Sequence, residues 1–175
     1  MALHSYDLDF MHSQLGFSVV HLMITRVHGV FTSWKGEVAL DLDEPSKSTV
    51  SITIDAASVD TRNPQRDGHL RSPDFFDTAN HPTITFKATS VRKSAAGLTL
   101  DGELTLRGVT KPVTFEAHGG ARAKDSQGRD RVGFHAHATI KRSDFGVSWS
   151  ATYPGGSVVV ADEVTLALDL QLIPR

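Results

Sequence analysis

The sequence predicts an all-β protein, folded as one extended eight-stranded antiparallel β-barrel with an apolar interior. Apolar and polar residues alternate with period two in about eight separate stretches, which is typical of strands with one buried face. Short turn sequences separate most of these stretches and favour hairpins. The length of 175 residues suits a single domain, residues 1–175, and nothing in the composition marks a second one.

The first two predicted strands lie near the start of the chain. Residues of one parity define each: Leu15, Phe17, Val19 and His21 in the first, and Val38, Leu40 and Leu42 in the second. Between them Phe31 and Trp34 fall on opposite parities, so we expect a β-bulge near residues 32–33. The irregular stretch 21–30 predicts a helical turn.

The other six predicted strands show the same alternation. Their apolar residues of one parity are Val50, Ile52 and Ile54; Ile84, Phe86 and Ala88; Leu98, Leu100, Leu104 and Leu106; Val113, Phe115 and Ala117; Val132, Phe134, Ala136, Ala138 and Ile140; and Val164, Leu166, Leu168, Leu170 and Leu172. Eight strands can close into a barrel with room for one ligand. Residues 63–76 break the pattern and predict one short helix, at about 64–72, that crosses the barrel.

The inward faces of these strands are almost wholly apolar. Several inward positions are small, which favours an open tube: Ala88, Gly102, Ala117, Ala136 and Ala138. A strand of about ten residues spans roughly 33 Å, and each buried methylene contributes roughly 0.8 kcal/mol. An isoprenoid or acyl tail could therefore bind inside without a polar anchor. An ordinary filled core is the alternative interpretation.

Polar residues indicate where the head group of a ligand could lie. His21 faces inward by parity, either as a satisfied core histidine or as a contact to a head group. Four residues of the predicted helix could converge on an anion such as a phosphate or a quinone oxygen, or could form a solvated, salt-bridged face: Arg66, Asp67, His69 and Arg71. His135 and His137 face outward with no third ligand nearby in sequence, so we interpret them as surface residues.

The chain lacks the motifs that mark common enzymes and cofactor sites. Gly-x-Ser-x-Gly, His-Glu-x-x-His, phosphate-binding and dinucleotide-binding patterns are absent, and so is cysteine. We therefore predict no catalytic residue, no metal and no cofactor. The 18 basic and 20 acidic residues give a net charge of -2, so the chain has no overall field that would attract nucleic acid or anionic lipid surfaces.

The start of the sequence bears on location. It reads Met1-Ala-Leu-His-Ser-Tyr-Asp, without the basic start and the apolar stretch of a signal peptide. No segment is apolar enough to span a bilayer. We expect a cytoplasmic protein without stable membrane insertion.

Five motifs, in order along the chain, resemble those of a known family. They are His12-Ser with Gly16-Phe-Ser-Val and His21-Leu-Met-Ile; Arg66-Asp-Gly-His-Leu-Arg-Ser-Pro-Asp-Phe-Phe-Asp; His81-Pro-Thr-Ile-Thr-Phe; Leu104-Thr-Leu-Arg-Gly-Val-Thr-Lys-Pro-Val-Thr-Phe; and Ile140-Lys-Arg-Ser-Asp-Phe-Gly-Val. With them the chain resembles, over nearly its whole length, the YceI-like family of lipocalin-like bacterial polyisoprenoid-binding proteins.

The resemblance implies a lipocalin-like barrel whose long channel holds a polyisoprenoid or a similar amphiphile, such as a quinone with an isoprenoid tail. It also implies that Arg66 and Asp67 tie the helix to the barrel. Members of the family are often dimeric, so a homodimer is one expectation. Many of them carry export signals, which this sequence does not show.

We therefore predict a non-catalytic carrier or storage protein for a long apolar isoprenoid-type lipid. The predicted ligand contacts are Phe17, Val19, His21, Phe31, Ile52, Ile54, His69, Phe75, Phe86, Leu100, Phe134, Ala136 and Leu168. Two alternatives stay open. One is an enzymatic or metal-dependent activity on a lipid head group through His21, His69 and Arg66, and the other is a ligand-free, stress-linked interaction module whose barrel is filled.

Overall fold

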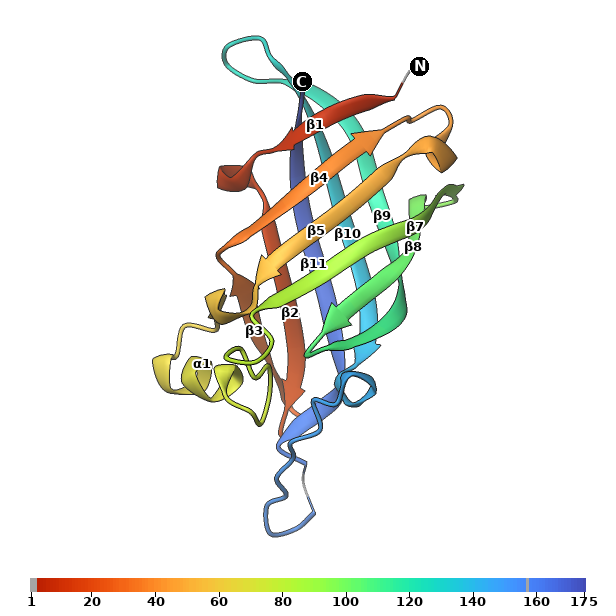
Figure 1. Cartoon of the computed structure of the whole chain (residues 1–175). Coiled ribbons are helices and arrows are strands. Elements are labelled where there is room, and N and C mark those ends of the chain that lie inside the picture. The colour runs from red at the N-terminus through yellow and green to blue at the C-terminus, as the bar shows by residue number, and fades with distance from the viewer. Residues whose placement is uncertain (1–2, 157) are drawn as a thin grey trace.

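The computed structural model describes residues 3–156 and 158–175, which form strands and a single α-helix. The helix is α1 (Pro64–Arg71), and the strands are β1 (His4–Leu8), β2 (Gln14–His21), β3 (Thr25–Phe31), β4 (Trp34–Leu40), β5 (Thr49–Asp55), β6 (Val59–Asp60), β7 (Thr83–Ser94), β8 (Gly97–Leu106), β9 (Val109–Lys124), β10 (Asp130–Lys141) and β11 (Val160–Pro174). Both termini lie at one end of the molecule, and α1 lies toward the other end (Figure 1).

Eight of the strands close an antiparallel ring. Hydrogen-bonded neighbours follow the order β1, β4, β5, β7, β8, β9, β10 and β11, and β1 pairs with β11 to complete the ring. The three remaining strands extend members of this ring: β2 also pairs with β11, β3 pairs with β2 and leads into β4, and β6 follows β5 and pairs with β3. The eight-stranded antiparallel barrel predicted from the alternation is confirmed.

The bulge predicted near residues 32–33 is a break between β3 and β4. There the N–H of Thr32 donates to the carbonyl of Ser58 at 3.2 Å, and the N–H of Asp55 donates to the carbonyl of Ser33 at 2.9 Å. The break therefore lies beside the one between β5 and β6. The chain bends at both breaks, which lie between the ring of strands and the end of the barrel that α1 covers.

The helical turn predicted for residues 21–30 is wrong, because this stretch contains the turn of the β2–β3 hairpin. The N–H of Ile24 donates to the carbonyl of His21 at 3.1 Å and closes the turn. Its two central residues, Leu22 and Met23, have φ of 51° and 62°, the left-handed values of a type I′ turn. Such values cost a non-glycine residue about 1 to 2 kcal/mol. Asn-Gly is the usual sequence of such a turn, and the chain has Leu-Met instead. The sequence therefore gave no indication of a hairpin here.

Local hydrogen bonds explain why α1 forms where the sequence predicts it. The Asn63 side-chain oxygen accepts from the N–H of Arg66 at 3.0 Å, and Pro64 occupies the first turn. The buried carboxylate of Asp67 accepts from the N–H and the hydroxyl of Thr61 at 2.9 and 2.6 Å. Arg66 donates to the hydroxyl and the carbonyl of Thr61 at 2.7 and 2.8 Å. Arg66 and Asp67 thus hold α1 to the segment that follows β6.

Buried apolar side chains form a cluster at the end of the barrel nearest the termini. The cluster there contains Tyr6, Leu8, Val38, Leu40, Val50, Val132 and Leu172, all buried. Further along, Gly102 on β8 makes room for an aromatic ring, because a Cβ atom at this position would collide with the ring of Phe86. The period-two alternation persists through β10, where Ala136 and Ala138 are buried between exposed neighbours.

Candidate functional site

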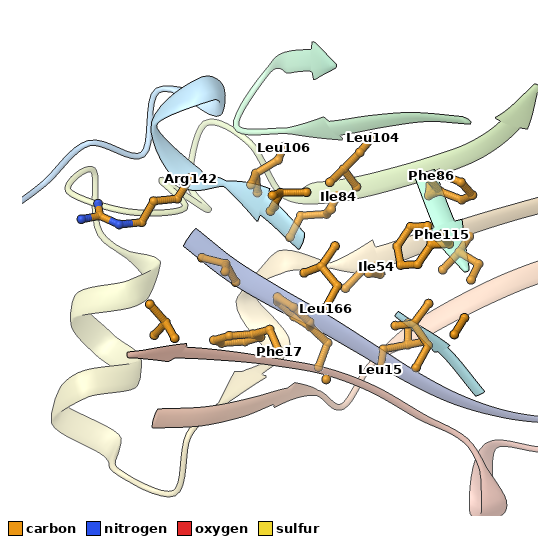
Figure 2. A pocket seen from close by; sticks show the side chains of 18 of the residues that line it. Leu15, Phe17, Ile54, Ile84, Phe86, Leu104, Leu106, Phe115, Arg142 and Leu166 are labelled. Carbon is orange, nitrogen blue, oxygen red and sulfur yellow. The ribbon is translucent and has the colours of Figure 1, made fainter. Parts of the chain in front are cut away.

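The barrel encloses an apolar cavity of about 370 Å³. Its walls come from β2 to β5, from β7 to β11, and from α1 and the loop after it. Figure 2 shows side chains of facing strands, among them Leu15, Ile54 and Leu166, pointing into the same space. The volume lies within the roughly 300 to 1,000 Å³ of small-molecule sites. The interior of this barrel is therefore partly open, unlike the filled core of the alternative interpretation.

The structure brings together every residue that the sequence predicts as a ligand contact. The residues lining the cavity include Phe17, Val19, His21, Phe31, Ile52, Ile54, His69, Phe75, Phe86, Leu100, Phe134, Ala136 and Leu168. Strand parity explains the placement of those that lie on strands, because side chains of one parity face the inside of a barrel. Their contact with a ligand stays a prediction.

Small side chains account for less of the open space than the sequence suggests. Of the five small inward residues, Ala117 and Ala136 line the cavity, and they lie opposite each other on β9 and β10. Ala88 and Ala138 belong to the packed core, and Phe86 covers Gly102. The cavity therefore owes more to the circumference of the barrel than to small residues.

Arg142 brings a guanidinium group to the border of the cavity. Its side chain is buried, with 8% of the residue exposed, and it donates to four backbone carbonyls. Nε donates to Ala161 at 2.9 Å, Nη1 donates to Val147 and Trp149 at 2.9 and 2.8 Å, and Nη2 donates to Val160 at 3.2 Å. One side chain thus holds the segment after β10 to the start of β11. In Figure 2 its guanidinium lies at one end of the group of cavity-lining side chains.

Asp162 fixes the 3-10 turn Arg142–Phe145 to β11. Its carboxylate accepts from the N–H and the hydroxyl of Ser143 at 3.0 and 2.7 Å. The hydrogen bond from the Ser143 hydroxyl is the main cause that lowers the pKa of Asp162, and burial opposes it. Burial also lowers the pKa of Arg142, whereas the charge of Asp162 raises it. The two residues together stabilise this end of the cavity.

We expect Asp162→Asn to lower the free energy of unfolding at pH 7 and to make it less sensitive to acid. Because the folded-state pKa of Asp162 is lowered, its carboxylate stabilises the fold above the unfolded pKa of about 3.9. This contribution is lost as the pH falls through the folded pKa. Urea denaturation at pH 7 and at about pH 2.5 should show a smaller decrease for the variant than for the wild type. Equal decreases would contradict the assignment.

Sequence reasoning did not place Arg142 or Trp149 at the site, although both line the cavity. The signal for Arg142 was present in the parity of β10, since residues 132, 136 and 138 face inward and residue 142 continues that series. Trp149 lies in the irregular segment between β10 and β11, where no periodicity indicates a direction.

His69 lines the cavity at the side of α1. Its Nε2 atom lies 2.8 Å from Oδ2 of Asp74. Its ring packs edge-on against Phe75 and Trp149, with centroid distances of 5.0 and 4.9 Å. These contacts make His69 part of an aromatic cluster at the border of the cavity.

Of the two possibilities left open for the polar residues of α1, the structure does not show convergence on one anion. Arg66 and Asp67 both bind Thr61, whereas Arg71 donates to the carbonyls of Ala57 and Val59 and His69 contacts Asp74. The partners satisfy loop and strand-end groups, so these side chains stabilise local structure. Residues 3–156 and 158–175 contain no cluster of three or more histidine, aspartate or glutamate residues that could hold a metal ion. No helix in the same ranges is long and apolar enough to cross a membrane.

Comparison with known proteins gives the family. A family model described as a YceI-like domain matches residues 6–172. Protein YceI of Escherichia coli is 40% identical over 144 residues, which cover 82% of this chain and 75% of that protein. The crystal structure of BcnA from Burkholderia cenocepacia superposes with a TM-score of 0.80 at 26% identity, over 94% of this chain and 99% of that one. A polyisoprenoid binding domain from Saccharophagus degradans shares the fold, with a TM-score of 0.65 at 17% identity over 99% of this chain and 100% of that one. The chain therefore belongs to the YceI-like family.

Proposed function

We propose that this protein binds a long apolar lipid of the isoprenoid type inside its barrel, and carries or stores it without changing it chemically. The observation that carries the proposal is the apolar cavity of about 370 Å³ enclosed by the strands. The ligand named for the similarly folded domain from Saccharophagus degradans supports the isoprenoid class. Fold similarity alone does not determine a ligand, so the chemistry of the walls has to agree with this choice.

The walls suit an aliphatic chain better than a polar molecule. Facing strands contribute leucine, isoleucine, valine and phenylalanine side chains, for example Phe17, Leu100 and Leu166. Burial of about ten methylene groups would contribute about 8 kcal/mol, which corresponds to roughly micromolar affinity before the ordering of the chain is counted. Such a ligand needs no polar anchor in order to stay bound.

The few polar side chains at the cavity favour one orientation of the lipid. His21, Arg66, His69 and Arg142 border the cavity at the end where α1 covers the barrel. The cluster of Tyr6, Leu8 and their neighbours packs the opposite end with apolar side chains. We infer that a polar head group lies at the α1 end and that the tail points toward the chain termini.

The hydrogen bonds at the polar end favour binding over catalysis. His69 directs Nε2 at Asp74, and Arg66 directs Nε and Nη2 at Thr61. Arginine stays protonated and cannot act as a general base, and one of the two ring nitrogens of His69 is engaged by Asp74. A carrier role requires no general base.

Native mass spectrometry and organic extraction of freshly purified protein test the proposal. We expect a bound species whose mass and fragmentation identify an isoprenoid chain, released on extraction with its structure intact. Repeated recovery of lipid-free protein that also takes up no added isoprenoid quinone would contradict it. A bound lipid that is converted to a different compound during incubation would favour an enzyme instead.

A further inference from the structure

Two neighbouring loops form an exposed apolar rim at the α1 end of the barrel. We define this rim as Met23, Ile24, Tyr153 and Val158, which are 73%, 79%, 56% and 39% exposed. The first two belong to the β2–β3 turn, and the other two lie in the connection between β10 and β11. The N–H of Leu22 donates to the carbonyl of Val159 at 3.0 Å, so the two loops run side by side. Figure 1 shows both toward the lower end of the molecule, where the connection between β10 and β11 extends furthest.

The rim adjoins the cavity directly. On the hairpin, Val20, His21 and Val27 line the cavity within a few residues of the turn, and Val159 and Val160 do so beside the second loop. Apolar surface therefore continues from the wall of the cavity to the exposed rim. An apolar molecule that entered or left at this end would meet the rim first.

The turn at the rim has an unfavourable backbone conformation in addition to exposed apolar side chains. Leu22 and Met23 both adopt positive φ, where asparagine and glycine are the favoured residues. Met23 and Ile24 also leave apolar area in water, without packing that would compensate. Strained, exposed residues of this kind are typical of positions that make contact outside the molecule.

The charge around the rim differs from that of the whole chain. Residues 19–29 and 147–161 contain no aspartate or glutamate, and their formal charge comes from Arg26, with His21 and His28 able to add more. The net charge of -2 gives the whole molecule no attraction to an anionic surface. The next acidic residues, Asp162 and Glu163, follow this range on β11, so the rim itself has no negative side chain.

We propose that the rim docks on the surface of a lipid bilayer that contains anionic lipids, with Met23 and Ile24 inserted among the acyl chains. Four side chains are too few to bury the roughly 800 Å² per partner of a stable protein complex. A reversible membrane contact needs only a small buried apolar area and some electrostatic attraction. Docking in this way turns the end of the cavity bordered by the rim toward the bilayer.

Sedimentation of the full chain with vesicles of phosphatidylethanolamine and one quarter phosphatidylglycerol tests this proposal. The informative variant is Leu22→Asn/Met23→Gly/Ile24→Ser, because it gives the type I′ turn its favoured residues and removes the apolar tip. We expect a Tm at or above that of the wild type and vesicle binding weaker by about tenfold or more. Met11→Ser is the matched control, since Met11 is 90% exposed at the other end of β2, and it should bind as the wild type does.

Several outcomes would overturn the docking proposal. One is that the wild type stays in the supernatant, whether or not it binds a protein partner instead. Another is that the triple variant sediments with the vesicles as well as the wild type does. Vesicles of phosphatidylcholine alone should bind less, and equal binding would contradict the role of charge. Met23→Ser/Ile24→Ser, which keeps Leu22, repeats the test if the triple variant is less stable. Bound lipid is measured in the same samples. Wild-type protein with an empty barrel counts against the proposed function, whereas wild-type protein that does not sediment with vesicles counts against docking.

Discussion

Tryptophan in place of Ala136 will narrow the cavity and strongly weaken the binding of a long apolar lipid. Ala136 lies on β10, is 6% exposed, and lines the cavity opposite Ala117. An indole ring there would occupy space that the lipid tail needs. Displacement of about four methylene groups costs about 3 kcal/mol, or roughly a hundredfold in affinity. Native mass spectrometry of the purified variant, and titration with an isoprenoid quinone, measure the loss.

Thr139→Trp provides the matched control for Ala136→Trp. Thr139 lies on the same strand but faces outward and is exposed, so the same ring added there should leave lipid binding unchanged. The Tm of both variants has to stay near that of the wild type for the comparison to hold. If Ala136→Trp binds the lipid as tightly as the control does, the ligand lies outside the barrel.

Arg142→Ala should cause the largest loss of stability among single substitutions near the cavity. It removes a guanidinium that donates to four buried or half-buried backbone carbonyls, those of Val147, Trp149, Val160 and Ala161. Hydrogen bonds from charged donors contribute about 1.5 to 3 kcal/mol each, and water will replace some of them. We expect the free energy of unfolding to fall by about 4 kcal/mol and the Tm by roughly 10 °C. Urea denaturation and thermal unfolding measure both quantities.

Two further substitutions separate the geometry of Arg142 from its charge. Arg142→Lys keeps the charge, but its single ammonium cannot reach four carbonyls in the fork geometry of a guanidinium, so it should recover only part of the loss. Arg129→Ala removes an arginine whose side chain is 58% exposed and pairs with Asp125. It should cost less than about 1 kcal/mol. If Arg142→Ala unfolds at the same midpoint urea concentration as the wild type, the segment after β10 does not depend on Arg142 for its stability.

The barrel and the cavity wall could be predicted from the sequence because both depend on strand parity. Residues such as Phe17, Ile52 and Phe134 alternate with polar neighbours, and a closed barrel turns one parity of every strand inward. The location of α1 was also readable, since Asn63 and Pro64 are characteristic of a helix start. These signals are local, so no knowledge of distant contacts was needed.

Features that depend on an unusual backbone conformation or on residues far apart in the chain could not be predicted in the same way. The β2–β3 turn was mistaken for a helical turn because Leu22 and Met23 stand where a type I′ turn normally has Asn-Gly. Gly102 was interpreted as empty space, whereas Phe86 from the neighbouring strand covers it. Only the strand register brings these two residues together.

The sequence by itself determined the barrel, the identity of its inward faces and the apolar character of its interior, because period-two alternation directly encodes which side chains are buried. Only the tertiary structure decided which hydrogen-bond partners the polar side chains have. Arg142 continues an inward parity, yet its guanidinium satisfies carbonyls on the segments that flank it in space. Arg66 and Asp67 both bind Thr61, and Arg71 donates to the carbonyls of Ala57 and Val59, so the three side chains do not meet at one anion. Hydrogen bonds depend on distance and direction between groups far apart in the chain, and a periodic pattern contains no information about either.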